Sequence, residues 1–415
     1  MKSTRAIVFE DGAYHGLLPL VYWRSVGDLR CGYHTLLARH RAALASPLTD
    51  LWVREDVAEI TAERHPLRVN APISPNESGS VLLINARYLP DKSARPSRPG
   101  TMGMIGDQMA FAHLPERDAG DLQPQAMTAL GPGDLPLRNL SVVEAPGAMM
   151  SYPWDLVLHN ERMLREDWPA SPGCQGRVSK GAHVIRPEHV FIGTDARVMP
   201  GAVLDASEGP IHIGSGVTVS PLAVVQGPAH IGDRTVIQPG AAIRHACSFG
   251  PSCKLGGEIE ATIVQGYTNK QHDGFLGHAF LGEWVNLGAD TVNSDLKNTY
   301  GAVRVPINGR EVNSGQTFVG SFIADHVKTG IGLTLPTGCV IGFGSSVALS
   351  TLAPKFVPSF SWITDQGTQQ YDPERCLAVA RKVMERRSIT TTPAQERLFL
   401  RLPEVCARHE AATGR

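Results

Sequence analysis

Residues 190–257 read VFIGTDARVMPGAVLDASEGPIHIGSGVTVSPLAVVQGPAHIGDRTVIQPGAAIRHACSFGPSCKLGG, and this stretch decides the fold. Apart from one short insertion, an aliphatic or aromatic residue recurs at every sixth position: Ile192, Val198, Leu204, Ile213, Val219, Val225, Ile231, Ile237, Ile243, Phe249 and Leu255. An α-helix would need a period near 3.6 and a strand a period of 2. The period of six predicts hexapeptide repeats wound into a parallel β-helix, about three hexads to each triangular coil.

Small residues and register breaks complete this pattern. Glycine follows the aliphatic position at Gly193, Gly214, Gly232 and Gly250, where a corner is expected. The register loosens between Ala261 and Gly274, and residues 293–316 interrupt it again. Irregular coils of a solenoid are typically loops that leave the rod, and such loops often carry binding and catalytic residues.

Four segments follow from these patterns. Residues 1–168 are predicted to form an α/β domain, and the polar, glycine-rich residues 169–185 a linker. Residues 186–353 are predicted to form the left-handed β-helix, and residues 354–415 a helical tail. The tail holds two amphipathic segments that each begin with proline, a residue favoured at the first position of a helix.

Individual elements can be predicted in the first domain. Short apolar runs predict strands at Ala6–Phe9 and Val81–Ile84, the second continuously apolar as in a parallel sheet. Helical spacing predicts helices over Gly32–Leu44 and Leu156–Trp168.

Composition narrows the class of protein. The 39 Lys and Arg residues nearly balance the 40 Asp and Glu residues, so no basic excess indicates binding to nucleic acid or to a membrane surface. The seven cysteines form no CxxC motif and read as reduced thiols. Without a signal peptide or a long apolar stretch, the sequence favours a cytoplasmic, soluble protein.

The stretch from Gly266 to Gly301, GYTNKQHDGFLGHAFLGEWVNLGADTVNSDLKNTYG, resembles a known family. It is similar to the acetyltransferase half of the bifunctional enzyme that makes UDP-N-acetylglucosamine from glucosamine 1-phosphate. The matching motif is a histidine three residues before an aromatic Leu-Gly, followed by Asn-Leu-Gly on the next turn. The resemblance implies that His272 is the catalytic base and that Asn286 positions the sugar or the acetyl group. It also implies substrate contacts from Phe275 and Lys270, acetyl-CoA as cosubstrate, and a homotrimer.

The N-terminal half points the same way. Residues 17–36 and 151–160 resemble a shortened, divergent sugar nucleotidyltransferase domain. The resemblance implies that a sugar phosphate or nucleotide sugar is bound by Arg24, Arg30, Asn85 and Asp155, with Mg²⁺ held by Asp155. Asn85 stands where the family has a metal-binding aspartate.

The sequence departs from the family at the phosphate ligands. Glu260 and Gln238 occupy the places of a lysine and an arginine, and an acidic residue cannot neutralise a phosphate. Phe275 replaces a tyrosine. Either other cations such as Arg244, Lys254 or Lys270 hold the phosphate, or the acceptor is not a sugar 1-phosphate.

These observations predict a transferase of sugar-nucleotide metabolism. Its expected reaction is acyl transfer from acyl-CoA to an amino sugar or amino-sugar phosphate, with nucleotidyl transfer in the first domain as a companion hypothesis. The alternative is a catalytically silent binding or regulatory protein. A metal hydrolase is disfavoured because His272 and His278 lie six residues apart with no further ligand cluster.

Overall fold

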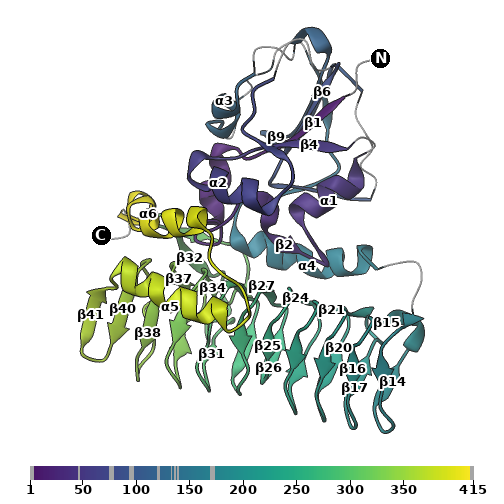
Figure 1. Cartoon of the computed structure of the whole chain (residues 1–415), viewed down its shortest axis with the longest axis vertical. Coiled ribbons are helices and arrows are strands. Elements are labelled where there is room, and N and C mark those ends of the chain that lie inside the picture. Colours follow the sequence, from purple (N-terminus) through teal and green to yellow (C-terminus); the bar gives the residue numbers. More distant parts are fainter. Residues whose placement is uncertain are drawn as a thin grey trace. The chain divides into compact units, whose positions relative to one another are not determined.

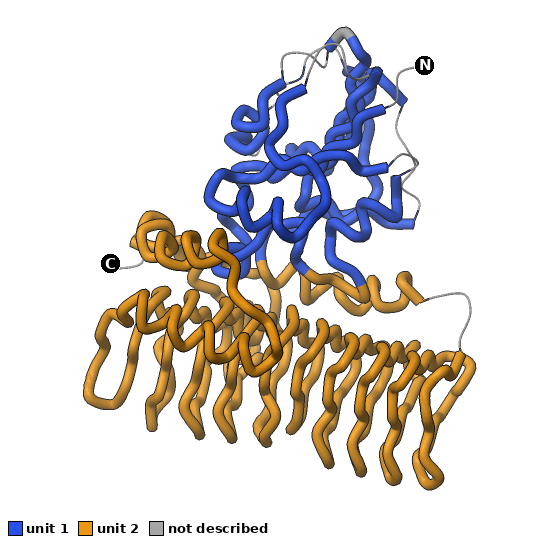
Figure 2. Tube along the Cα trace, in the orientation of Figure 1, with its two compact units in different colours: residues 1–29, 34–152 blue, residues 30–33, 153–415 orange. Residues whose placement is uncertain are grey.

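The computed structural model describes residues 4–44, 47–73, 79–92, 98–118, 122–131, 133–134, 137, 140–168 and 173–411. Its contacts divide the chain into two compact units (Figure 2). Unit 1 comprises Met1–Leu29 and His34–Tyr152, and unit 2 comprises Arg30–Tyr33 and Pro153–Arg415.

Unit 1 is built around one seven-stranded sheet (Figure 1). The strands lie in the order β10 (Ser141–Glu144), β8 (Thr101–Ile105), β9 (Gln108–Leu114), β6 (Val81–Asn85), β1 (Arg5–Phe9), β4 (Leu48–Trp52) and β5 (Arg68–Val69). Strand β1 lies inside the sheet and pairs in parallel with β4 and β6. All five residues of β1 and of β6 are buried, which explains the apolar runs Ala6–Phe9 and Val81–Ile84 within them.

The other elements of unit 1 are short. They are η1 (Gly12–Leu17), η2 (Val26–Asp28), β3 (His34–Thr35), α1 (Leu36–Ala43), α2 (Glu55–Arg64), β7 (Tyr88–Pro90), η3 (Glu116–Asp118), α3 (Pro124–Thr128) and β11 (Gly147–Met149). Helix α1 begins later than the predicted Gly32, because Gly32 adopts a φ of 72° and the Thr35 side chain caps the helix instead.

Unit 2 contains a three-sided parallel β-helix, whose sides we call faces 1, 2 and 3. Face 1 holds β12 (Gly173–Cys174), β15 (Val190–Ile192), β18 (Ile211–Ile213), β21 (Ala229–Ile231), β24 (Cys247–Phe249), β27 (Ile263–Gly266), β30 (Phe280–Glu283), β34 (Phe322–Ile323), β37 (Val340–Ile341) and β39 (Phe356–Val357). Face 2 holds β13 (Arg177–Val178), β16 (Arg197–Val198), β19 (Thr218–Val219), β22 (Val236–Ile237), β25 (Lys254–Leu255) and β28 (Asn269–Lys270), and face 3 holds β14 (His183–Ile185), β17 (Val203–Asp205), β20 (Val224–Gln226), β23 (Ala242–Ile243), β26 (Glu258–Glu260) and β29 (Phe275–Gly277).

Later coils are less regular. They add β31 (Val292–Asn293) paired with β36 (Thr334–Leu335), the hairpin β32 (Arg304–Ile307) and β33 (Arg310–Asn313), and the sheet of β35 (Lys328–Thr329), β38 (Ser346–Ala348), β40 (Ser361–Thr364) and β41 (Gly367–Gln370). The segment β2 (Arg30–Cys31) and η4 (Pro187–His189) also belong to unit 2.

The residues that recur at every sixth position form the core of the β-helix. Every one of them, from Ile192 to Leu255, is at most 2% exposed. Because parallel pairing places equivalent positions above one another, Val219, Ile237 and Leu255 stack along face 2. Burial of each aliphatic side chain contributes about 1.5–3 kcal/mol, so this column stabilises the rod.

Close approach of successive coils explains a corner glycine. A methyl group added at Gly232 would lie 2.6 Å from the carbonyl carbon of Gly250 in the next coil. No side chain fits at that distance, so the sequence keeps glycine there.

In the part of unit 2 that the structure describes, three α-helices pack. Helix α4 (Pro153–Glu166) lies on face 1, against β24 and β30. Helices α5 (Pro373–Glu385) and α6 (Pro393–Glu410) contact each other, and both have proline at the start and a side-chain cap, from Asp372 and Thr392. They are the two helices predicted for the tail.

Two boundaries differ from those expected. We expected residues 1–168 as one domain, but α4 packs with the β-helix and the contact boundary lies at Tyr152. We expected a linker at residues 169–185, but the described residues 173–185 contain β12, β13 and β14, the first coil. Among the described residues no coil precedes this one, and its Cys174 and Val178 are exposed, so the segment lacks the buried aliphatic positions of the later coils.

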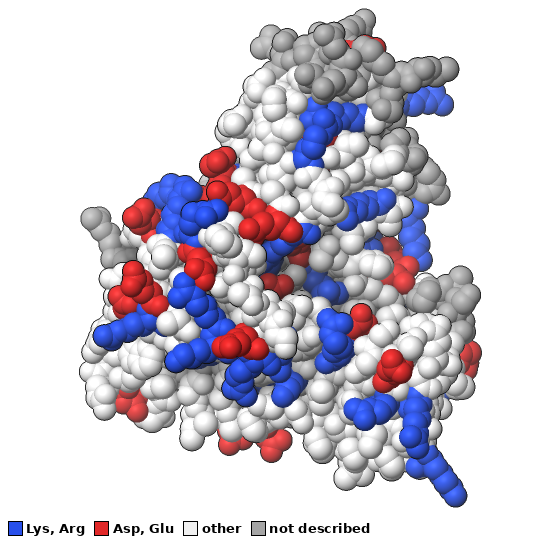
Figure 3. Space-filling model, viewed as in Figure 1, with Lys and Arg blue, Asp and Glu red and all other residues white. Residues whose placement is uncertain are grey.

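Positive and negative side chains are interspersed over the face of the molecule shown in Figure 3. Among the described residues, no helix is long and apolar enough to cross a membrane.

Candidate active site

Helix α4 lies beside one corner of the β-helix, between faces 3 and 1. Asn160 of α4 donates from Nδ2 to the carbonyl of Ala246 at 2.8 Å, which ties the helix to this corner. The residues that turn the corner on successive coils, Ala246, Ala261 and His278, all adopt a left-handed φ between 43° and 58°. The corner therefore presents equivalent positions of three coils to α4.

Two pockets run along this corner, and together we call them the α4 groove. The smaller, of about 180 Å³, is lined by Trp154, Val157, Leu158, Glu161, His245, Ala246, Ala261, His278, Phe318 and Val319. The larger, of about 410 Å³, is lined by Glu161, Arg165, Asp205, Glu208, Gln226, Gly227, Pro228, Arg244 and His245. They share Glu161 and His245, so they are adjacent parts of one groove.

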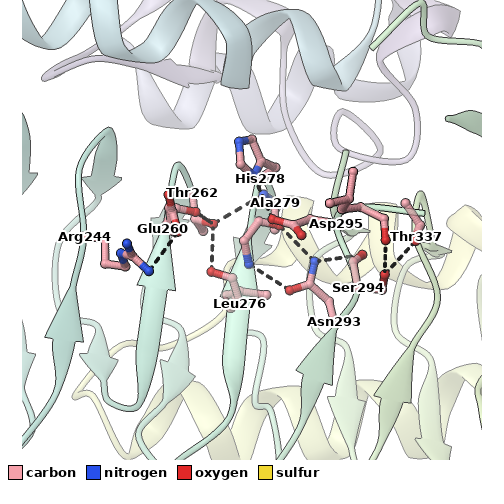
Figure 4. A network of polar contacts seen from close by, with 12 residues as sticks. Arg244, Glu260, Thr262, Leu276, His278, Ala279, Asn293, Ser294, Asp295 and Thr337 are labelled. Atoms are coloured by element: carbon pink, nitrogen blue, oxygen red, sulfur yellow. Dashed lines mark hydrogen bonds and ion pairs between the residues drawn. The ribbon is translucent and has the colours of Figure 1, made fainter. Parts of the chain in front are cut away.

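A histidine–aspartate pair borders the smaller pocket (Figure 4). Nδ1 of His278 lies 2.8 Å from Oδ2 of Asp295, and the two side chains are 24% and 15% exposed. An ionised carboxylate can only accept, so Nδ1 carries the proton and Nε2 of the neutral ring is left as an acceptor. Within the described part of the chain, Nε2 of His278 has no hydrogen-bond partner.

Residues at both ends of the irregular insertion contact His278. Asp295 lies where the chain leaves the rod after β31, and Phe318 lies where it returns before β34. The Phe318 ring stacks on His278, with centroids 5.2 Å apart and an interplanar angle of 25°. The imidazole is therefore fixed by a hydrogen bond at one edge and by packing on one face.

The backbone of His278 is fixed from inside the coil. The buried amide of Asn293 accepts from Gly277 N at 2.8 Å and donates to Gly277 O at 2.9 Å. The amide of His278 donates to the carbonyl of Glu260, and its carbonyl accepts from Gly320. Asn293 thus positions the strand that carries His278 into the groove.

The charges of the larger pocket are unevenly paired. Arg165 pairs with Glu161 at 2.8 Å. Arg244 pairs with Glu258 at 2.8 Å and lies 3.6 Å from Glu260. Among the described residues, Asp205 and Glu208 have no ion pair. Carboxylates thus outnumber the cations in this part of the groove.

The residues predicted from the acetyltransferase resemblance lie at other positions. His272 is exposed in the bend after β28, and it does not line the α4 groove. Asn286 bridges in register to Asn269, and its Oδ1 accepts from Asn269 Nδ2 at 3.3 Å. Phe275 is half-buried on face 3, where a methyl added at Gly277 would contact its ring at 2.4 Å.

Lys270 points into the rod rather than out of it. It is 2% exposed and occupies the register position of Leu255, in the column of core residues. Its Nζ donates to the carbonyls of His272 and Asp273 at 2.6 and 3.0 Å. Burial lowers the pKa of Lys270 to about 8. The ammonium group therefore stabilises the bend that carries His272. Its hydrogen bonds go to backbone carbonyls of that bend.

The residues predicted for nucleotide binding are divided between the units. Arg24 and Asn85 belong to unit 1, whereas Arg30 and Asp155 belong to unit 2. Arg24 is buried and donates to Leu20 O at 3.2 Å. Arg30 donates to Tyr33 O at 2.7 Å, and burial lowers its pKa. Asp155 lies in the first turn of α4.

These residues do not fit a Mg²⁺ site. Asn85 is buried, and its Nδ2 donates to Asp11 Oδ2 at 2.7 Å. Nowhere in the described residues do three or more His, Cys, Asp or Glu side chains gather as metal ligands. Mg²⁺ needs several oxygen ligands in near-octahedral geometry, and Asp155 supplies one carboxylate.

Sequence reasoning missed the His278–Asp295 pair, although both residues stand in the stretch that it singled out. The two are 17 residues apart, close to the length of one coil, so the coil period could have placed them at the same corner. The register break at residues 293–316 hid this relation.

Comparisons with known proteins agree with this architecture. Residues 6–171 match the family model described as sugar nucleotidyl transferase, and residues 210–245 match the model of bacterial transferase hexapeptide repeats. The first part of the chain is therefore similar to sugar nucleotidyl transferases, and part of the β-helix is similar to bacterial transferase hexapeptide repeats. The predicted resemblance and fold class are confirmed.

The chain is also similar to parts of curated bifunctional transferases. It is 32% identical over 91 residues to the bifunctional sugar-1-phosphate nucleotidylyltransferase/acetyltransferase of Sulfurisphaera tokodaii, covering 21% of this chain and 23% of that protein. It is 31% identical over 218 residues to the bifunctional protein GlmU of Synechococcus sp. strain CC9311, covering 48% of this chain and 43% of that protein. The chain thus spans less than half the length of these relatives.

Among solved structures, the UDP-N-acetylglucosamine acyltransferase of Francisella novicida shares 15% identity with the chain. The match covers 57% of this chain and 79% of that one, with a TM-score of 0.19. A similarity of this size supports no argument about the chain.

Proposed function

We propose that the chain is an acyltransferase of sugar-nucleotide metabolism, in which His278 activates an amine of the acceptor. The observation that carries the proposal is the geometry of the His278–Asp295 pair. His278 lines the smaller pocket of the α4 groove, and its hydrogen bond to Asp295 fixes both the tautomer and the orientation of the ring. This is the arrangement that a general base requires.

The reaction needs an acceptor nitrogen in its neutral form, two proton transfers through His278 and one exchange of bonds. The acceptor nitrogen attacks the thioester carbonyl of an acyl-CoA, and Nε2 of His278 takes the proton that the nitrogen loses. The carbon–sulfur bond then breaks, and the proton passes to the departing thiolate. Asp295 stabilises the imidazolium that forms between the two steps.

The charges of the groove support an amino sugar as the acceptor. Asp205 and Glu208 lack ion pairs among the described residues, whereas Arg165 and Arg244 are each paired with a carboxylate. This excess of negative charge favours an amino group, which binds as a cation and loses one proton to solvent before it attacks, and it disfavours a phosphate. This supports the free amino sugar over its 1-phosphate.

The remaining assignments belong to the same proposal. Acetyl-CoA is the donor to test first, and a homotrimer is the assembly expected of a hexapeptide rod. His272 remains a second candidate for the base, since its bend lies in the stretch that resembles the acetyltransferase family. The two histidines occupy different corners of the coil, so variants can separate them.

Thiol release from acetyl-CoA tests the proposal. Glucosamine, other amino sugars and their 1-phosphates are the acceptors, and wild type is compared with Asp295→Asn and Glu208→Gln. Release with free amino sugars, a kcat reduced about 10²–10⁴-fold in Asp295→Asn and a raised KM in Glu208→Gln would support it. Wild-type release that Asp295→Asn leaves unchanged would contradict the assigned base.

A further inference from the structure

Unit 1 presents the carboxyl ends of three parallel strands at one edge of its sheet. Glu10 and Asp11 follow β1, Arg54 follows β4 shortly after its end, and Asn85 and Arg87 come from the end of β6. Ligands of open α/β sheets bind at this edge. The side chains that gather there therefore decide what unit 1 can bind.

Asp11 accepts three hydrogen bonds at this edge. Arg87 donates to both of its oxygens, from Nε to Oδ1 at 2.7 Å and from Nη2 to Oδ2 at 2.6 Å. Asn85 adds the third hydrogen bond to Oδ2. The guanidinium of Arg87 is 1% exposed, and its Nη1 donates to Gln108 Oε1 at 2.8 Å.

Glu10 is engaged in the same way by a second arginine. Arg54 Nη1 donates to Oε1 at 2.8 Å, and the backbone amides of Val26 and Arg54 donate to Oε1 and Oε2. Nη2 of Arg54 donates to the carbonyls of Val21 and Arg24. Glu10 is completely buried. We call these two pairs, Asp11–Arg87 and Glu10–Arg54, the edge ion pairs.

The turn after β1 is also occupied by its own chain. The amide of Gly12 donates to Leu130 O at 2.7 Å, and a methyl added at Gly12 would lie 2.8 Å from the same oxygen. At Gly16, a methyl would lie 2.2 Å from Ser151 O. Close backbone packing accounts for both glycines, so they do not form a phosphate cradle.

We infer that Arg54 and Arg87 occupy the place of the divalent cation at the carboxyl edge of unit 1, so that this edge takes no metal–nucleotide complex. Asp11 and Glu10 each already accept three hydrogen bonds on a carboxylate that has about four lone-pair sites, and the neighbouring guanidinium repels a second cation. The inference concerns unit 1 alone and is independent of the acyl transfer proposed for unit 2.

The same geometry predicts what happens when Arg87 is replaced. Its guanidinium now contacts the carboxylate of Asp11, Oε1 of Gln108 and the carbonyl of Met150, and these oxygens would be left around one vacated position. Oxygen ligands suit Mg²⁺ and Mn²⁺. The variant Arg87→Met is therefore expected to gain a divalent site. Arg68→Met is the matched control, because Arg68 pairs with Asp50 elsewhere in unit 1.

Mn²⁺ binding to the full chain, followed by electron paramagnetic resonance, tests the inference. The double variant Asp11→Leu/Arg87→Met replaces the ion pair with apolar side chains, an exchange that buried pairs often tolerate. We expect wild type, the double variant and Arg68→Met to bind the same number of Mn²⁺ ions, and Arg87→Met to bind one more.

Two results would overturn the inference. The first is a wild type that binds one Mn²⁺ more than the folded double variant, because Asp11 would then be a ligand despite Arg87. The second is a folded Arg87→Met that gains no Mn²⁺. If Arg87→Met does not fold, the comparison of wild type with the double variant decides alone.

Discussion

Replacement of Lys270 by methionine tests whether this lysine belongs to the core or to a substrate site. Its side chain is 2% exposed, and its Nζ donates to two backbone carbonyls. Burial lowers its pKa from 10.5 to about 8. In the unfolded chain the lysine returns to its ordinary pKa, so the two states bind different numbers of protons between these values.

The sign and size of the effect follow from that difference. Below about pH 8 both states are protonated, and the stability contributed by Lys270 does not change with pH. Between about pH 8 and 10.5 the unfolded state holds the proton that the folded state has lost, so the free energy of unfolding rises with pH. A pKa shift of roughly 2.5 units corresponds to about 3 kcal/mol over the whole window.

Urea denaturation at several pH values between about 7 and 10 measures this effect. Other groups titrate in the same window, including Lys328, whose pKa burial also lowers to about 8, so the quantity of interest is the difference between wild type and Lys270→Met. We expect the variant to lose about 1–3 kcal/mol of the alkaline gain. If wild type and Lys270→Met showed the same pH dependence of the free energy of unfolding, the reasoning would be refuted. Lys270 would then be a solvent-exposed lysine that is available to bind a substrate.

Two further predictions concern the rod and the corner that carries His278. Asn293→Ala leaves the backbone amide and carbonyl of Gly277 without their partner, so we expect chemical denaturation to show a loss of about 1–3 kcal/mol in the free energy of unfolding. We also expect kcat to fall with little change in KM. An unchanged kcat would show that Asn293 does not position His278. Gly232→Ala places a methyl 2.6 Å from Gly250 C, so we expect a loss of about 1–3 kcal/mol in the free energy of unfolding by the same measurement. The control is Gly173→Ala, whose methyl meets nothing within 4 Å and which should leave the stability nearly unchanged. Equal stability of the two variants would contradict the packing argument.

The fold was predictable because its main signal is local and repeated. Residues such as Ile231 and Leu255 recur at a period that only one architecture satisfies, and each repetition supports the others. The first described coil was not predicted, because an end coil is covered by other coils on one side only. Val178 is therefore exposed, and the sequence of this segment resembles a linker.

The sites were less predictable because they depend on pairs of residues that are distant in sequence. Arg87 and Asp11 are 76 residues apart, and no local pattern relates them. His278 and Asp295 are closer, but an irregular insertion lies immediately beside Asp295. Lys270 was predicted to be a surface cation because a lysine among buried core residues is rare. The carbonyls that accept its hydrogen bonds lie in a bend outside the hexapeptide pattern, so the sequence did not indicate them.

The measurement that tests the central claim most directly is a comparison of His278→Asn with His272→Asn in the acetyl-CoA assay with a free amino sugar. We predict that His278→Asn loses about 10²–10⁴-fold in kcat while His272→Asn stays near wild type. The opposite ranking would contradict the assignment of His278 and would restore His272 as the base. Absence of thiol release by wild type with the whole acceptor panel would contradict the proposed acetyl transfer and favour a silent binding protein.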